Sequence, residues 1–115
     1  PICGIEGCFL HELTLPTSPY VTNFKENRDE LVQRLFRLYN QTVFENKIPK
    51  DMHIFWNSDP NISAAGRCIN IFQDGRRSSI IDLYETLCNS AERVVETLVH
   101  EMCHAACWII DGVML

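Results

Sequence analysis

The sequence lacks any hydrophobic run long enough to cross a membrane. A membrane-spanning helix needs about 20 consecutive apolar residues, and no apolar stretch of this 115-residue chain approaches that length. Internal repeats and low-complexity tracts are absent as well. The hydrophobic share of 46% and the charged share of 22% are ordinary for a globular protein. We therefore expect one soluble domain with a substantial core and no membrane partner.

Positive charge is in deficit. The chain carries 10 Lys and Arg residues against 15 Asp and Glu residues, which gives a formal net charge of −5. Such a chain does not attract a phosphate backbone as a whole, so contact with DNA needs a local basic patch or sequence outside this chain. Arg67, Arg76 and Arg77 are the candidates for a patch of this kind. The competing interpretation is that they are ordinary solvated turn residues.

An initiator methionine and a secretory signal are missing from the first residues, which read PICG. We therefore expect a processed chain or a fragment. The six cysteines do not predict a disulfide framework, because the chain is larger than the small secreted scaffolds that depend on one. We expect reduced thiols in an intracellular protein. Cys3, Cys8 and His11 resemble a metal knuckle only loosely, and a packed or exposed thiol pair is the preferred interpretation.

The pattern of apolar residues divides the chain into an arm and a domain. Residues 1–22 follow no clear period and contain Pro16 and Pro19 close together, which predicts an irregular arm. From residue 23 apolar residues recur at helical spacing until Ile48-Pro49 stops the pattern, which predicts one long amphipathic helix. Three short segments with strand character follow, at residues 52–56, 65–72 and 79–84. The arm is expected to pack on the domain through Ile5, Phe9, Leu10 and Leu13.

A second helix is predicted after Asn89 and Ser90, either of which can cap its N-terminus. Its apolar face recurs up to about Ile110, and Asp111-Gly112 provides the exit. The predicted order of a long helix, a small three-stranded sheet and a C-terminal helix is that of an α+β domain.

The second helix contains the sequence H-E-x-x-H. His100 and His104 are four residues apart, so both imidazoles lie on one helix face and can reach one zinc ion, with Glu101 beside them. Zinc lowers the pKa of its bound water toward about 7, and a nearby carboxylate can take the proton. Chance gives this pattern in roughly one chain of this length in a few hundred. The spacing therefore predicts zinc ligands at His100 and His104 and a general base at Glu101.

A third protein ligand is not identified by spacing. A catalytic zinc site usually has three protein ligands and one open position. His11 lies in the expected arm, and His53 lies in a strand pattern where it is expected to face solvent. Cys107 shares the helix face but lies a further turn along. A structural zinc site closed by Cys103 or Cys107 stays open as an alternative.

Several segments together resemble the SprT-like metalloprotease domain. The most specific of them is residues 90–108, which contain TLVHEMCHAA around the motif. The other segments that carry the resemblance are Leu38-Tyr39-Asn40 with Val43-Phe44, Ile54-Phe55-Trp56-Asn57 and Ala65-Gly66-Arg67-Cys68. The resemblance covers about residues 8–112, nearly the whole chain.

The resemblance implies a zincin-like fold over residues 23–115 and a nuclear, zinc-dependent protease. Its implied substrates are proteins crosslinked to DNA, with His100, His104 and Glu101 in the family's ligand and base positions. The family places a third histidine in a Gly-His-Gly type segment shortly after the helix. Here Gly112 is followed by Val113, Met114 and Leu115. The domain is therefore expected to be C-terminally incomplete, and a catalytically inactive scaffold module of the same fold is the alternative.

A sheet edge is the expected place for the substrate. Zincin-type proteases bind a peptide as an added strand along an edge beside the metal. The segment 79–84 is the candidate, and an ordinary half-buried strand is the competing interpretation. The candidate contact residues are Ser79, Ile80, Ile81, Asp82 and Leu83. The oligomeric state has no signature in the sequence.

Overall fold

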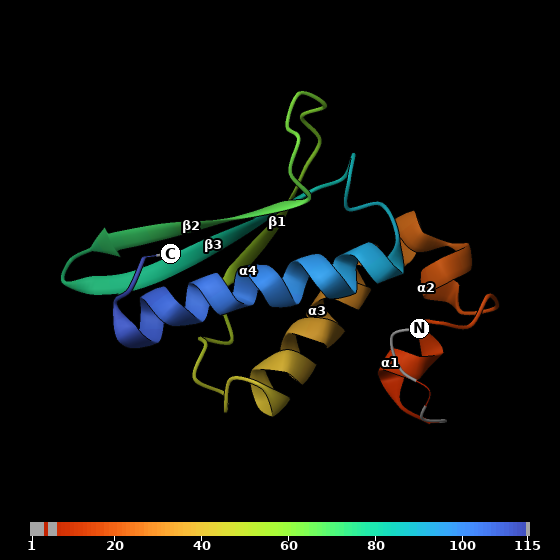
Figure 1. Cartoon of the computed structure of the whole chain (residues 1–115), viewed down its shortest axis with the longest axis horizontal. Coiled ribbons are helices and arrows are strands. Elements are labelled where there is room, and N and C mark those ends of the chain that lie inside the picture. Colours follow the sequence, from red (N-terminus) through yellow and green to blue (C-terminus); the bar gives the residue numbers. More distant parts are fainter. Residues whose placement is uncertain (1–3, 5–6, 115) are drawn as a thin grey trace.

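The computed structural model describes residue 4 and residues 7–114 and has the α+β architecture expected from the sequence (Figure 1). One layer of helices lies against one face of a three-stranded sheet. Within the described residues no helix is both long enough and apolar enough to span a membrane. In chain order the elements are α1 (Phe9–Glu12), α2 (Pro19–Thr22), α3 (Phe24–Thr42), β1 (His53–Asn57), β2 (Gly66–Gln73), β3 (Arg76–Tyr84) and α4 (Ala91–Asp111).

Helix α3 is the long amphipathic helix of the sequence pattern, but it ends earlier than expected. The expected stop was Ile48-Pro49, whereas the last helical residue is Thr42. Glu45 and Asn46 both have positive φ values, of 55° and 59°, which no α-helix accepts. The buried Asn40 side chain then donates to the Ile48 carbonyl at 2.8 Å and accepts from its N–H at 3.1 Å. These two bonds replace helix continuation and lead the chain toward β1.

The sheet has the order β1-β3-β2, with β3 in the centre. β1 runs parallel to β3, and β2 runs antiparallel to it. The β2–β3 turn consists of Asp74 and Gly75, whose φ values of 54° and 73° are those of a type I′ hairpin. The three predicted strands are thus confirmed. Their order was not predictable from the strand segments themselves.

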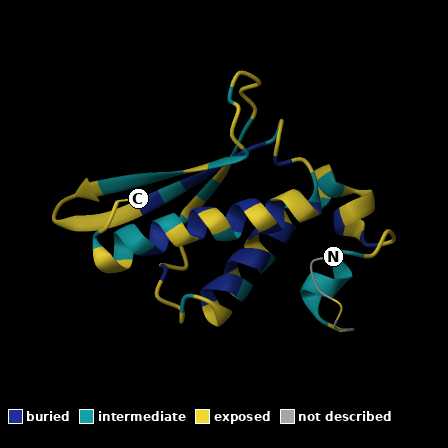
Figure 2. Ribbon diagram, in the orientation of Figure 1, coloured by how far each residue is buried: buried dark blue, intermediate teal, exposed yellow. Residues whose placement is uncertain are grey.

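The core lies between the sheet and helices α3 and α4. Helix α4 packs on β2 and β3, and α3 packs on α4. The β3 side chains that face α4 include Ile81 and Leu83, both fully buried, and they meet Leu98 and Met102 in the same hydrophobic cluster. Dark blue bands along α3 and α4 in Figure 2 mark this buried layer. The motif helix is therefore backed by a packed core along most of its length.

The N-terminal arm is not irregular, as the sequence suggested, but forms two one-turn helices. Tyr20 of α2 packs edge to face on Phe9 of α1, with ring centroids 5.7 Å apart. Arg34 of α3 lies over the Phe9 ring at 3.9 Å and donates to the Tyr20 hydroxyl at 2.8 Å. Phe9, Leu10 and Leu13 join the core as predicted, whereas Ile5 lies outside the described residues. The division into an arm and a domain stays a prediction.

Candidate metal centre

The helix that carries the motif is capped at both ends. The Ser90 side chain accepts a hydrogen bond from the Arg93 backbone N–H at 3.2 Å, which satisfies one of the N–H groups that a first turn leaves unpaired. At the other end Gly112 has a φ of 69°, and the N–H groups of Gly112 and Val113 donate to carbonyls of the last turn. The predicted boundaries are confirmed, with Ser90 rather than Asn89 as the cap.

The two histidines of the motif direct their ring nitrogens to one place. His100 and His104 have their Nε2 atoms 3.1 Å apart and their ring centroids 4.7 Å apart. Two nitrogens that each lie about 2.0–2.1 Å from a tetrahedral zinc ion are about 3.3–3.4 Å from each other. The pair therefore fits two ligands of a single ion. His100 is exposed and His104 is half-buried, so an ion at this position can be reached from solvent.

Glu101 lies next to the pair but is turned beneath β2. Its exposed fraction is only 7%, and it has no hydrogen bond or ion pair with another described residue. The position of Glu101 suits a base that is held close to a metal but does not bind it.

Gly66 allows the motif helix to approach β2 this closely. A Cβ atom at Gly66 would meet Thr97 Cγ2 at 2.6 Å and Glu101 Cγ at 3.2 Å. Only glycine fits without displacement of α4. Sequence reasoning assigned Gly66 no role, although an isolated glycine in a strand pattern is a known sign of close backbone approach.

An open cavity of about 320 Å³ lies beside the motif, at the junction of α4 with the beginning of β2. No sequence pattern indicated this cavity, because its walls come from two segments that are far apart in the chain. The residues that line it are Ala65, Gly66, Glu96, Thr97, His100 and Glu101.

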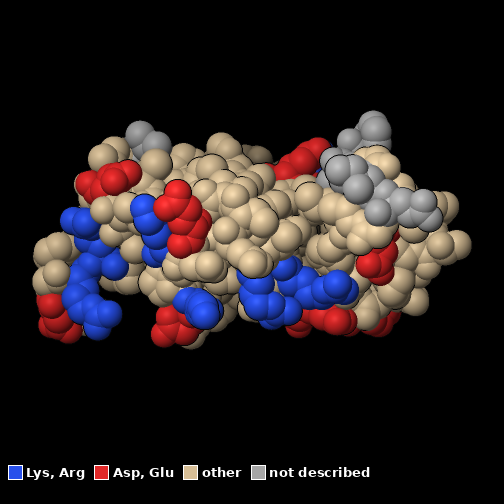
Figure 3. Space-filling model, turned by 90° about the horizontal axis from the view of Figure 1, so that it is seen from below, with Lys and Arg blue, Asp and Glu red and all other residues tan. Residues whose placement is uncertain are grey.

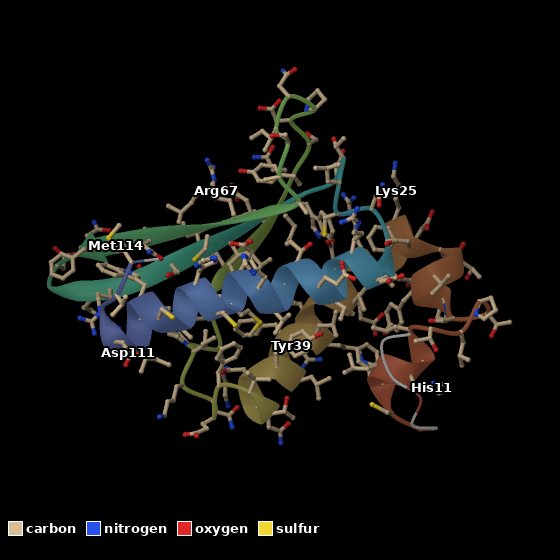
Figure 4. The ribbon with its side chains drawn as sticks, viewed as in Figure 1. His11, Lys25, Tyr39, Arg67, Asp111 and Met114 are labelled. Carbon is tan, nitrogen blue, oxygen red and sulfur yellow. The ribbon has the colours of Figure 1, made fainter. Side chains whose placement is uncertain are left out.

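The third ligand is not found in the part of the chain that the structure describes. Among residue 4 and residues 7–114, no group of three or more His, Cys, Asp or Glu side chains could hold a metal ion. His53 is exposed and stacks on Phe55, as expected of a solvent-facing strand residue. His11 lies in α1, beyond the N-terminal end of α4 (Figure 4). A structural zinc site, which requires four protein ligands, has no support within these residues.

The cysteines near the motif are held in their protonated form. Burial raises the pKa of the Cys68 thiol, a hydrogen bond with Ser79 lowers it, and the Glu101 carboxylate raises it again. Burial also raises the pKa of Cys103, and the Cys107 thiol adds to this effect. Thiolates are the form that binds metals and attacks electrophiles. These thiols are therefore poor candidates for a nucleophile at neutral pH.

The predicted substrate edge is wrong, because residues 79–84 belong to the central strand. Ser79 to Leu83 pair with β2, and from Ile80 onward the same residues also pair with β1. A strand with neighbours on both sides offers no free edge to a peptide. The edges of the sheet are β1 and β2, and β2 is the edge strand that packs against α4.

The three arginines do not form one basic patch. Arg67 pairs with Asp82 in the register and Arg77 pairs with Phe72, a separation of about 17 Å along the strands. Arg67 projects from the sheet away from α4 and forms an ion pair of 3.1 Å with Asp82 (Figure 4). Arg77 instead approaches the last carbonyls of α4 at 3.4–3.5 Å. On the face in Figure 3, basic side chains lie in small groups beside acidic ones.

The family model described as the SprT-like family matches residues 32–114, which include α3 from Val32 onward, the whole sheet and α4 with the motif. The chain belongs to the SprT-like family. The α+β fold, the three-stranded sheet and the C-terminal helix agree with this membership. No solved structure matches the chain.

Three germ cell nuclear acidic proteins are among the relatives of this SprT-like chain. The human protein is 40% identical over 98% of the chain, and the Drosophila melanogaster protein is 40% identical over 81% of it. The Caenorhabditis elegans germ cell nuclear acidic-1 protein is 33% identical over 76%. The matched region is only 17%, 9% and 16% of these three proteins. Their whole-protein properties therefore extend well beyond the region that this chain shares with them.

Proposed function

We propose that this chain carries the catalytic helix of a zinc metallopeptidase, with His100 and His104 as metal ligands and Glu101 as general base. The observation that carries the proposal is the 3.1 Å distance between the two Nε2 atoms, with the buried Glu101 carboxylate alongside. Membership of the SprT-like family supports the same assignment. The proposed reaction is hydrolysis of a peptide bond.

Each side chain of the motif has a separate role in this proposal. Zinc, when bound, supplies a Lewis acid that polarises a carbonyl group and makes water acidic near neutral pH. His100 and His104 hold the ion through their Nε2 atoms from one face of α4. The Glu101 carboxylate accepts the proton of the attacking water and later donates it to the leaving amine. Its burial under β2 restricts the positions that the carboxylate can take.

The substrate backbone is proposed to bind along the free edge of β2. The Tyr84 N–H donates to the Ala65 carbonyl at 2.9 Å, which identifies these two residues as a hydrogen-bonded pair of the β2–β3 ladder. Because pairing alternates in an antiparallel ladder, the backbone groups of Gly66, Cys68 and Asn70 point away from β3. An extended peptide added there would run beside His100 and Glu101, as β-strand addition requires.

The physiological substrate is proposed to be a protein crosslinked to DNA, in the nucleus. The proposal follows from the resemblance of the motif segments to proteases of this kind, and the names of the relatives describe nuclear proteins. The net charge of −5 and the separation of Arg67 from Arg77 disfavour DNA binding by the surface of this chain. We therefore propose that sequence outside this chain makes the DNA contact. Cleavage of a crosslinked protein with and without DNA tests the idea.

Metal analysis and one substitution test the catalytic proposal. The intact protein is expected to bind one zinc per domain and to cleave a peptide substrate. Glu101→Gln should retain zinc and lose cleavage, whereas His100→Ala and His104→Ala should lose both. Unchanged cleavage by the Glu101→Gln variant with zinc bound would exclude Glu101 as the base.

A second candidate is a scaffold module of the same fold without turnover. The specific observation in its favour is that the described residues supply two ligands and no third. Zinc affinity of residues 1–115 and of a version extended past Leu115 separates the two candidates. Strong binding that appears only in the extended version favours the protease, and weak binding in both favours the scaffold.

A further inference from the structure

The cavity beside the motif is acidic. Among its lining residues Glu96 and Glu101 are carboxylates, Thr97 supplies a hydroxyl group, and no lysine or arginine is present. Glu96 is exposed and forms no ion pair with any described residue. Glu101 is almost fully buried and lines the same cavity. Two carboxylates therefore border a space that is open to solvent, and Glu96 has no counter-charge among the described residues.

The cavity lies beside the place proposed for the cleaved peptide bond. Glu96 precedes His100 by four residues, which is about 6 Å along the helix axis. Gly66 and Ala65, at the beginning of the β2 edge, form the opposite wall. A peptide that lies along β2 and passes the histidine pair would therefore place the side chain of a residue near the cleaved bond in this space.

We infer that this cavity receives a lysine or arginine side chain of the substrate and that Glu96 is a specificity-determining residue. The inference rests on the proposed peptidase function. A cationic group pairs with the Glu96 carboxylate, while its aliphatic stem packs on Ala65. An acidic side chain would be repelled by Glu96, and an apolar one would desolvate the Glu96 carboxylate without compensation. The substrate class is a peptide with a basic residue beside the cleaved bond.

The test uses two peptides that differ only in lysine against norleucine, which has nearly the same shape without the charge. We expect kcat/KM of the intact protein to be about fivefold higher for the lysine peptide than for the norleucine peptide. This ratio corresponds to the interaction free energy of a partly exposed charge pair. Glu96→Gln should remove most of this preference, chiefly by lowering kcat/KM for the lysine peptide. Glu92→Gln is the matched control, because it removes the same charge from α4 one turn earlier and outside this cavity.

The inference is overturned if Glu96→Gln keeps the preference, or if Glu92→Gln lowers it equally, since the effect would then come from net charge. A binding measurement on metal-free protein separates failure of the inference from failure of the proposed function. If neither peptide is cleaved but lysine binds more tightly in a Glu96-dependent way, the peptidase proposal fails and the cavity assignment stands. If the peptides are cleaved but lysine is preferred in neither the cleavage assay nor the binding assay, the peptidase proposal stands and the cavity assignment fails.

Discussion

Substitution of Gly66 by alanine tests the packing of the motif helix on the sheet. The added Cβ would lie 2.6 Å from Thr97 Cγ2, 3.2 Å from Glu101 Cγ and 3.3 Å from the Asp82 carbonyl oxygen. Thr97 is β-branched and buried in a helix, so its Cγ2 has little freedom to rotate away. Forcing a methyl group into packed surroundings costs about 1–3 kcal/mol. We expect Gly66→Ala to lower the free energy of unfolding by that amount.

The same displacement reaches the metal site. Because Thr97 and Glu101 lie on the α4 face that would move away from β2, the geometry around the histidine pair should be affected as well. We expect zinc affinity to fall in Gly66→Ala even where the protein remains folded. Urea unfolding followed by circular dichroism gives the stability, and titration against a chelating indicator gives the affinity.

A double mutant isolates the contact with Thr97. Thr97→Ser removes Cγ2 and keeps the hydroxyl group, so Gly66→Ala should be better tolerated in that background, with a coupling energy of about 1 kcal/mol. Gly4→Ala is the matched control, because a Cβ at Gly4 meets nothing within 4 Å. Equal stability of Gly66→Ala and the parent protein, or strict additivity with Thr97→Ser, would refute the reasoning.

Three further predictions concern the framework around the site. Arg34→Met should release the N-terminal arm, because Arg34 contacts both Phe9 and Tyr20. Limited proteolysis should then cut the variant within residues 7–22 faster than the parent protein, and an equal rate of proteolysis would contradict this. Asn40→Ala should lower stability by about 2–3 kcal/mol, since it leaves the Ile48 N–H and carbonyl unpaired, whereas exposed Gln41→Ala should change it little. Burial raises the pKa of Tyr39 to about 12. The neutral phenol is therefore favoured in the folded state, so its contribution to stability is present below about pH 10 and is lost as the pH rises toward 12. Tyr39→Phe should flatten this fall in denaturant titrations, and an identical slope in both proteins would show that Tyr39 is not its source.

Local patterns were sufficient for the elements that depend on neighbouring residues. The spacing of apolar residues predicted both long helices, and Ser90 and Gly112 marked the ends of α4. Likewise, the four-residue separation of His100 and His104 requires them to share a helix face, which the 3.1 Å distance between their Nε2 atoms confirms. Alternation and turn residues predicted three strands, because hairpin geometry at Asp74-Gly75 is fixed by backbone angles of those two residues.

Tertiary structure alone decided how these elements meet. β3 is the central strand, and its Ile81 and Leu83 are buried against α4. These contacts join residues that are far apart in the chain. The sequence of a single strand therefore does not show whether that strand lies at an edge of the sheet. The same packing separates Arg67 from Arg77, brings Gly66 against Thr97 and encloses the cavity that Glu96 lines. Side-chain periodicity determines which face of an element is apolar. Which element packs on that face depends on the free energy of burying all the apolar faces together, and this is decided only when the whole chain folds.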